Sequence, residues 1–319
     1  MRPLRLILAL AAVLALGGCH RSEGPYPSRE IKLIVQAAPG GLSDTVSRVI
    51  AVGMEPVLGV PVVCENKPGA AGALAFSYVT RRPPDGYTIG HGPVEIAMVR
   101  TLGFAQVGPE DMDLLCLVSK TQPVLAVHAD APWQDLGAFL EAARQRPGFY
   151  VVGNSGTGSI WHINALLLER ATGVRLIHCP FGGSSASLTA LLGRHLDAAV
   201  AGAGEVAPHV AAGGLRVLAV LDARRSNIYP DTPAITEFGY EPGASAWSGF
   251  YAPRGLPADR RDKLVAAIRR AFETPAFQKV CEQRGMEPVF LPPEEFRKFA
   301  LEQAQFFARV IPELLKGGA

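Results

Sequence analysis

The sequence predicts an α/β protein built from two domains. Short apolar strands alternate with helical segments along nearly the whole chain, which is the pattern of a sheet layered with helices. Strands such as residues 31–35 and 215–221 are apolar at nearly every position, as in parallel strands buried on both faces. Apolar strands at 114–120 and 124–128 lead into the second run of alternation, and residues 215–221 lead out of it. We therefore expect two lobes joined by a two-stranded hinge.

The N-terminal residues predict export from the cytoplasm. Arg2 and Arg5 precede an apolar run, residues 6–16, which is shorter than the roughly 20 residues of a membrane-spanning helix. The run ends in Leu16-Gly17-Gly18-Cys19, which resembles a lipobox. We therefore predict that residues 1–18 are a signal peptide and that Cys19 is the lipidated first residue of a membrane-anchored periplasmic lipoprotein. A plain signal peptide with a chance cysteine is the alternative, and which membrane holds the anchor stays open.

The remaining chain is long enough for two domains of ordinary size. Residues 19–28 hold Ser, Gly and Pro without an apolar pattern, so we expect a tether there. We assign residues 29–120 and 222–319 to the first lobe, and residues 121–221 to the second.

Apolar periodicity and the residues at segment ends define the expected elements in order. In the first lobe, strands are expected at 31–35, 61–65 and 87–90, with helices that begin at Ser43 and after Gly72. In the second lobe, we expect strands at 150–152, 175–179 and 197–201, and helices at 135–145, 160–171, around 188–192 and at 205–212. Residues 247–251 then form a strand, 259–274 a helix, and Pro292 with Pro293 opens a last helix that has acids in its first turn.

Three loops rich in glycine and hydroxyl side chains follow predicted strands. Glycine lets backbone N–H groups approach a bound group, and a helix start offers unpaired amides, so each loop is a candidate anion site. None holds Lys or Arg, so dipoles and hydrogen bonds would bind the anion. The first loop is at 39–44, the second at 154–159 and the third at 181–184. For the second loop, the alternative is a turn whose hydroxyl groups only cap the following helix. The predicted ligand-binding residues are Ala38, Pro39, Gly40, Gly41, Ser43, Asp44, Asn154, Ser155, Gly156, Thr157, Gly158, Ser159, Phe181, Gly182, Gly183 and Ser184.

Charge and cysteine spacing exclude several classes. The formal net charge is +2 and Lys and Arg are scattered, so we expect no nucleic-acid partner. Cys64, Cys116, Cys179 and Cys281 lie far apart without a C-x-x-C pair. Disulfides and isolated thiols both remain open for them, whereas we expect no metal site and no cofactor.

Short segments in a fixed order cover nearly all of the chain after Cys19. They are Tyr26-Pro27-Ser28, Pro39-Gly40-Gly41 with Asp44, V-x-E-N-x-P-G at 63–69, Pro84-Asp85-Gly86-Tyr87-Thr88, residues 154–159, 178–183, Pro208-His209, 216–220, Ala252-Pro253 and Gly255-Leu256-Pro257. The ordered set resembles the Bug-type periplasmic solute-binding proteins, the extracytoplasmic receptors of tripartite tricarboxylate transporters (TTT family).

The resemblance implies a type II periplasmic-binding-protein fold of two lobes and no enzyme activity. It implies a small carboxylate ligand held between the lobes by the three loops, and small and large integral membrane transporter subunits as partners. Cys179 and Gly182 depart from the family, which usually has an apolar residue and a lysine there. Ala201 stands where many members carry an aspartate that reads the far end of the ligand, so a relative's substrate is a poor guide.

Other functions would use the same residues. A pyridoxal-phosphate or nucleotide enzyme would use residues 154–159 as a phosphate cup, but neither G-x-x-x-x-G-K-[ST] nor G-x-G-x-x-G is present. A serine hydrolase could pair Ser155, Ser159 or Ser184 with His162, His178 or His209, but none lies in a G-x-S-x-G elbow. A lipoprotein that senses a ligand for a signalling partner remains an alternative to transport.

The expected ligand is a mono- or dicarboxylic acid. Short loops indicate a small ligand, and the lack of Lys and Arg argues against phosphates. The loops do not distinguish among dicarboxylates, citrate-like acids, amino acids and aromatic acids. Thr157 is the first residue to test, because its hydroxyl can donate to an anion near the helix start.

Overall fold

The computed structural model of this chain describes residues 25–316. The predicted signal peptide, Cys19 and most of the predicted tether lie outside the described residues. Within the described range, no helix has the length and apolarity needed to cross a membrane.

The first lobe is built on a six-stranded sheet with strand order β11-β4-β10-β3-β1-β2. β1 is parallel to β2 and β3, whereas β10 runs antiparallel between β3 and β4. Apolar side chains of β1 are fully buried, as expected for a central parallel strand. The strands are β1 Ile31–Val35, β2 Val62–Asn66, β3 Thr88–Pro93, β4 Met112–Thr121, β10 Ala246–Pro253 and β11 Glu287–Leu291.

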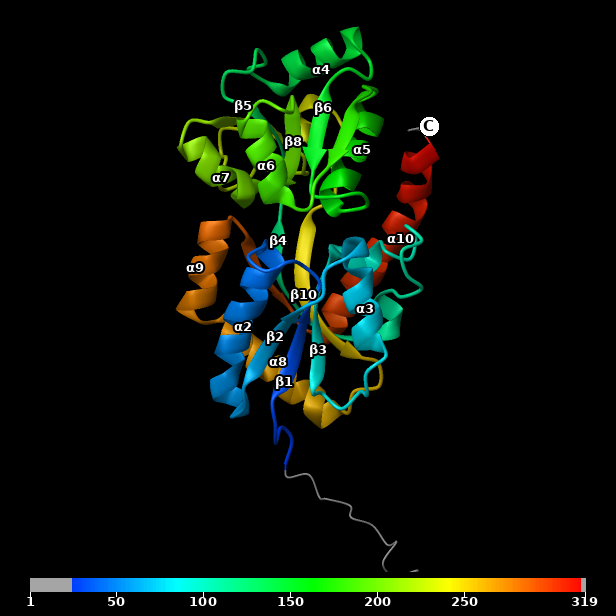
Figure 1. The fold of residues 1–319 in the computed structure, drawn as a ribbon, viewed down its shortest axis with the longest axis vertical. Helices are drawn as coiled ribbons and strands as arrows, with labels where there is room; N and C mark the ends of the chain where they lie inside the picture. The colour runs from blue at the N-terminus through cyan, green and yellow to red at the C-terminus, as the bar shows by residue number, and fades with distance from the viewer. Residues whose placement is uncertain (1–24, 317–319) are drawn as a thin grey trace, which may run out of the picture.

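Helices cover both faces of this sheet (Figure 1). α2 packs against α8 so closely that a Cβ atom on Gly53 would collide with Ala271, so glycine is required at this crossing. Sequence periodicity missed α9 and β11. The helices are α2 Leu42–Leu58, α3 Ala73–Thr80, α8 Ala258–Phe272, α9 Pro275–Arg284 and α10 Pro293–Lys316, with 3-10 turns η1 Ala70–Gly72, η2 Val94–Ala97 and η3 Pro109–Asp111.

The second lobe is built on a five-stranded sheet with strand order β7-β6-β8-β5-β9. β6 is parallel to β7 and β8, and β5 is antiparallel to β8 and β9. Its strands are β5 Pro123–His128, β6 Val151–Asn154, β7 Ile177–Pro180, β8 Ala198–Gly202 and β9 Leu215–Val220, and its helices are α4 Leu136–Gln145, α5 Ile160–Thr172, α6 Ser184–Leu192 and α7 Ala203–Ala211. The two sheets confirm the predicted two-lobed α/β architecture.

The chain passes between the lobes at two neighbouring places. β4 ends at Thr121 and β5 begins at Pro123, so the outward crossing is a nearly continuous strand. The return runs through residues 221–245, which include η4 Ile235–Phe238. The backbone N–H of Leu221 donates to the carbonyl of Pro123 at 2.8 Å, which holds the two crossings side by side.

Two segments that the prediction assigned to the first lobe contact the second. Asn164 of α5 exchanges hydrogen bonds with the backbone N–H and carbonyl of Ala244, each at 2.9 Å. α10 packs against β4 of the first sheet, and its C-terminal half lies beside α5 (Figure 1). Arg170 of α5 pairs with Glu241 at 3.4 Å and with Glu313 of α10 at 3.8 Å.

Candidate functional site

The loops singled out in the sequence follow strands whose carboxyl ends face the boundary between the lobes. β1 points from the first lobe toward the second, and β6 points in the opposite direction (Figure 1). Residues 36–41 follow β1, residues 155–159 follow β6, and residues 181–183 follow β7. Ligands of open α/β sheets bind outside the carboxyl ends of the strands. These loops therefore form the candidate site.

In the first loop, Asp44 supports the backbone from behind. Its carboxylate accepts hydrogen bonds from the Gly40 amide at 2.9 Å, from Arg48 Nε at 3.0 Å and from Asn66 Nδ2 at 2.8 Å. Burial alone would raise the pKa of Asp44, but these three donors together lower it. Ala38, Pro39 and Gly40 are exposed beside it. Asp44 thus holds the loop in place and has its oxygens already engaged.

A polar chain runs from the first loop into the sheet. Ser43 Oγ accepts from Gln36 Nε2 at 2.8 Å, and Gln36 Oε1 lies 3.1 Å from His91 Nδ1. His91 Nε2 is hydrogen-bonded to Ser248 Oγ. Burial lowers the pKa of His91 to about 3, so its ring is neutral at pH 7 and donates through only one nitrogen. The chain fixes the Ser43 side chain at the start of α2.

In the second loop, the protein's own groups occupy the amides at the start of α5. Ser159 Oγ accepts from the His162 amide at 3.3 Å, and His162 Nδ1 accepts from the Gly158 amide at 3.2 Å. The Ile160 amide donates to Glu95 Oε1 of the first lobe at 3.2 Å. Asn154 Oδ1 accepts from the Gly156 amide at 3.0 Å.

Thr157 is the exposed residue of this loop. Burial raises the pKa of Glu95, and the hydrogen bond from the Ile160 amide opposes the rise.

The third loop lies directly against the second. The Phe181 amide donates to the carbonyl of Asn154 at 3.0 Å, and a Cβ atom on Gly156 would lie 3.3 Å from the Phe181 carbonyl oxygen. Gly183 is the N-cap of α6 with no side-chain cap, and Cβ atoms added at Gly182 or Gly183 would meet nothing within 4 Å. The start of α6 therefore borders open space.

Glu205 lies behind the third loop and was missed in the sequence. Its Oε2 accepts from the Gly202 amide at 3.0 Å, and the Ser184 hydroxyl and the Trp161 indole also donate to its carboxylate. Burial raises the pKa of Glu205, and these donors together with Arg284 oppose the rise. The Ser184 hydroxyl is thus directed to Glu205.

Contacts across the boundary bring the loops of the two lobes together. Arg284 of α9 lies near Glu205 and donates to Thr45 Oγ1 at 3.4 Å, which links the start of α2 to the third loop. A Cβ atom on Gly158 would lie 2.8 Å from the Phe104 ring of the first lobe. Glu95, Glu205 and Arg284 carry no local sequence signal, because only tertiary packing places them here.

The histidines, Ala201 and the cysteines singled out in the sequence have structural surroundings. His178 Nε2 lies 2.9 Å from Glu169 Oε2, and the His178 and His162 rings are 5.3 Å apart. Ala201 is fully buried within the apolar cluster of the second lobe. The four cysteines of the described chain are free thiols, and residues 25–316 contain no group of His, Cys, Asp and Glu suited to a metal ion.

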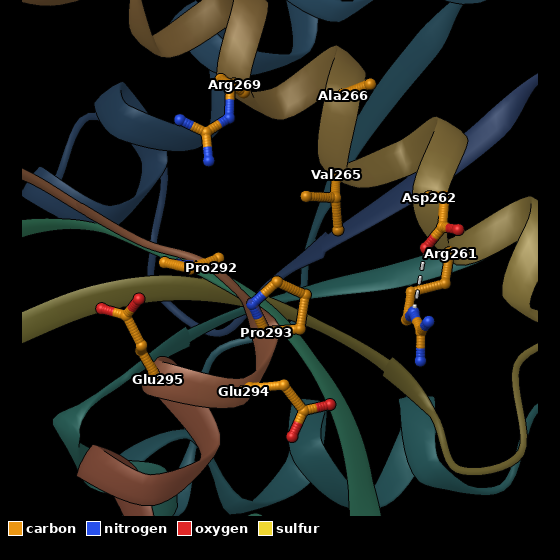
Figure 2. Close-up of a pocket in the computed structure, with 9 residues that line it drawn as sticks. All are labelled: Arg261, Asp262, Val265, Ala266, Arg269, Pro292, Pro293, Glu294 and Glu295. Atoms are coloured by element: carbon orange, nitrogen blue, oxygen red, sulfur yellow. Dashed lines mark hydrogen bonds and ion pairs between the residues drawn. The ribbon is translucent and has the colours of Figure 1, made fainter.

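Two cavities of the described residues lie away from these loops. The larger, about 490 Å³, lies on the first lobe between α8 and the start of α10. Figure 2 shows its charged rim, with the Arg261–Asp262 pair on one side and Glu294 and Glu295 on the other. The smaller, about 290 Å³, lies beside the crossing between the lobes.

Two facing α/β lobes with glycine-rich loops between them define a two-lobed solute receptor. Residues 46–315 match the family described as the tripartite tricarboxylate transporter family receptor (TctC), and the chain belongs to this family. It is 29% identical to protein BugT of Bordetella pertussis over 98% of each chain.

Two solved structures with ligands share the fold. MatC from Rhodopseudomonas palustris, with bound malate, is 26% identical with a TM-score of 0.80, over 90% of this chain and 100% of MatC. Rpa4515 of R. palustris, with adipate, is 25% identical with a TM-score of 0.83, over 91% of this chain and 98% of Rpa4515.

The family confirms the predicted Bug-type resemblance and the type II periplasmic binding fold. The chain is an extracytoplasmic solute receptor of the TctC type and not an enzyme, since the family consists of receptors. The phosphate-enzyme and hydrolase alternatives are therefore set aside.

Proposed function

We propose that this receptor binds a small carboxylate between its lobes and delivers it to the small and large membrane subunits of a tripartite tricarboxylate-type transporter. One observation carries the proposal. The starts of α2 and α6 lie on opposite lobes, and their N-caps, Gly41 and Gly183, have no side-chain cap. Their amides suit an anion that bridges the lobes. Malate and adipate in the related structures support a carboxylate.

The proposed ligand contacts are the residues predicted from the three loops, with different roles. Asp44 and Ser184 act as supports, because the Gly40 amide and Glu205 already bind them. The ligand can come close to the backbone at four glycines, Gly40, Gly41, Gly182 and Gly183. Thr157 is exposed and offers its hydroxyl.

A thermal-shift screen of carboxylic acids, with malate and adipate included, tests the ligand class. Calorimetry of Thr157→Val with the best acid then tests the residue. Losing a hydrogen bond to a charged group costs about 1.5–3 kcal/mol, so affinity should fall roughly ten- to a hundredfold. Stabilisation by neutral sugars or cations, with none by any carboxylate, would rule the carboxylate proposal out.

The lobes are proposed to close about the two crossings. Residues 29–120 with most of 246–319 would form one body and 121–221 the other, with 222–245 following the second lobe through Asn164. A ligand that contacts both lobes favours the closed state by its difference in affinity for the two states. X-ray scattering profiles with and without ligand should differ, and profiles that overlay would contradict closure.

Anchoring through Cys19 is also proposed, on the lipobox-like sequence. The mature protein should then partition into detergent and carry the mass of acyl chains. Cys19→Ser should release the protein or block its processing. Recovery of the wild-type protein in water with an N-terminus other than Cys19 would end the proposal.

A further inference from the structure

The smaller cavity lies at the crossing between the lobes. Its walls are Lys120 near the end of β4, residues 243–245 of the return crossing, and Phe299, Gln303 and Phe306 of α10. Ala244 is hydrogen-bonded to Asn164 of the second lobe, whereas Lys120 belongs to the first sheet. A molecule in this cavity would therefore touch segments that follow different lobes.

Lys120 brings a positive charge to this cavity. Its Nζ lies 4.7 Å from the centroid of the Phe299 ring. Within residues 25–316, the lysines that form ion pairs are Lys32 and Lys67, so Lys120 has no carboxylate partner there. The nearest acidic residue in register is Glu287, opposite Lys120 on the neighbouring strand β11, and it is exposed.

Trp247 lies beside the same ring but does not line the cavity. Trp247 lies opposite Lys120 in the β4–β10 register, so both side chains lie on one face of the sheet. Its ring is 5.7 Å from that of Phe299, and its Nε1 is buried without a hydrogen-bond partner among the described residues. Because the Trp247 ring is buried against Phe299, it can report on a molecule that binds beside Phe299.

We propose that this cavity is a second binding site, for a small carboxylate with an aromatic or other apolar body. The carboxylate pairs with the Lys120 ammonium, while the body packs against Phe299 and Phe306. Such a ligand binds at a place separate from the loop site, and the two sites influence each other's affinity through the lobe arrangement. The bound ligand favours one arrangement of the lobes, because the walls of the cavity belong to segments that follow different lobes.

The tryptophans give each region its own reporter. Trp161 contacts Glu205 behind the loop site, Trp247 lies at the crossing, and Trp133 packs against Phe139 in the second lobe. Protein labelled with 5-fluorotryptophan should give separate fluorine signals, assigned with single Trp→Phe variants. Benzoate, the probe, should shift the Trp247 signal with saturation, and benzamide, its neutral counterpart, should not.

Lys120→Met keeps the packing on Phe299 and removes the charge. The apparent affinity for benzoate at Trp247 should fall roughly ten- to a hundredfold. Lys120→Arg keeps the positive charge, so benzoate should still shift the Trp247 signal. This variant tests the need for the charge if Lys120→Met does not fold. Glu287→Gln is the matched control and should keep or strengthen binding. A Trp247 signal that ignores benzoate, or that shifts equally with benzamide or in Lys120→Met, would overturn the proposal.

Discussion

The helix starts at the boundary between the lobes differ in what binds their amides. At α5, Ser159, His162 and Glu95 accept hydrogen bonds from the loop and the first turn. At α2 and α6, the N-caps are Gly41 and Gly183, and no side chain caps either helix. The loop richest in hydroxyl groups is therefore the one whose amides are most fully used by the protein itself.

A loop rich in serine, threonine and glycine is therefore not by itself an anion site, because its helix-start amides must also be free. Serine at an N-cap accepts from its own helix, which satisfies the amides that would otherwise bind a ligand. Glycine at an N-cap supplies no acceptor and leaves the amides to water or to a ligand. We therefore expect the ligand carboxylate to bind the helix-start amides of α2 and α6 and not those of α5.

The largest expected effect concerns the support behind α2. Asp44→Asn removes a buried charge that binds the Gly40 amide, Arg48 and Asn66. The free energy of unfolding should fall by about 3 kcal/mol. Because the pKa of Asp44 is lowered in the folded state, this contribution is present above the unfolded pKa near 3.8 and disappears as the pH falls further.

Urea unfolding of both proteins at pH 7 and pH 3 measures this effect. The difference in stability between wild type and Asp44→Asn should shrink at the lower pH. An unchanged stability at pH 7, with weaker ligand binding, would make Asp44 a direct ligand contact.

The second prediction tests the open end of α6. Gly182→Ala adds a methyl group where no atom lies within 4 Å, at a residue without a positive φ. Stability should be unchanged, but a ligand in that space would lose about 1.4 kcal/mol, or roughly tenfold in affinity. Calorimetry with the best acid from the thermal-shift screen measures the change. Gly137→Ala in α4, far from the loops, is the control, and equal affinities in all three proteins would place the ligand elsewhere.

The third prediction tests the filled end of α5. Ser159→Ala removes the N-cap acceptor of the His162 amide. The free energy of unfolding should fall by about 1 kcal/mol, as for other N-cap serines. Ligand affinity should change less than about twofold, under roughly 0.4 kcal/mol. A large loss of affinity with full stability would reverse the comparison between α5 and α6.

Local patterns predicted most of the elements around these helices. The N-cap Ser159 and the N-cap Asp135 are readable because capping depends on residues a few positions apart. α9 was missed because its buried apolar residues are few, Phe277 and Cys281. β11 has three consecutive apolar residues but also contains Pro288, which weakens a strand prediction and is tolerated here because β11 is an edge strand. The site was predicted only in outline. Glu95, Glu205 and Arg284 reach it from three separate elements, and no spacing in the sequence links them.

The last prediction uses pH to separate the two kinds of helix start. Burial, followed by the neighbouring His178, lowers the pKa of His162 to about 4, while Glu169 opposes the shift. The unfolded pKa is about 6.5, so the unfolded chain binds more protons between pH 6.5 and pH 4. The contribution of neutral His162 is therefore complete above about pH 6.5 and is lost as the pH falls toward 4.

Protonated His162 cannot accept the Gly158 amide, so acid should loosen the start of α5 and leave the ends of α2 and α6 intact. His162→Gln removes this titration but keeps an acceptor, whereas buried His91 titrates in both proteins. Urea unfolding between pH 7 and pH 4.5 should show a steeper loss of stability in wild type than in the variant. Parallel pH profiles would mean that the His162 bond to Gly158 does not hold the loop. Amide exchange at Gly158 gives a local readout, because its protection should fall with pH in wild type before that of β1 does.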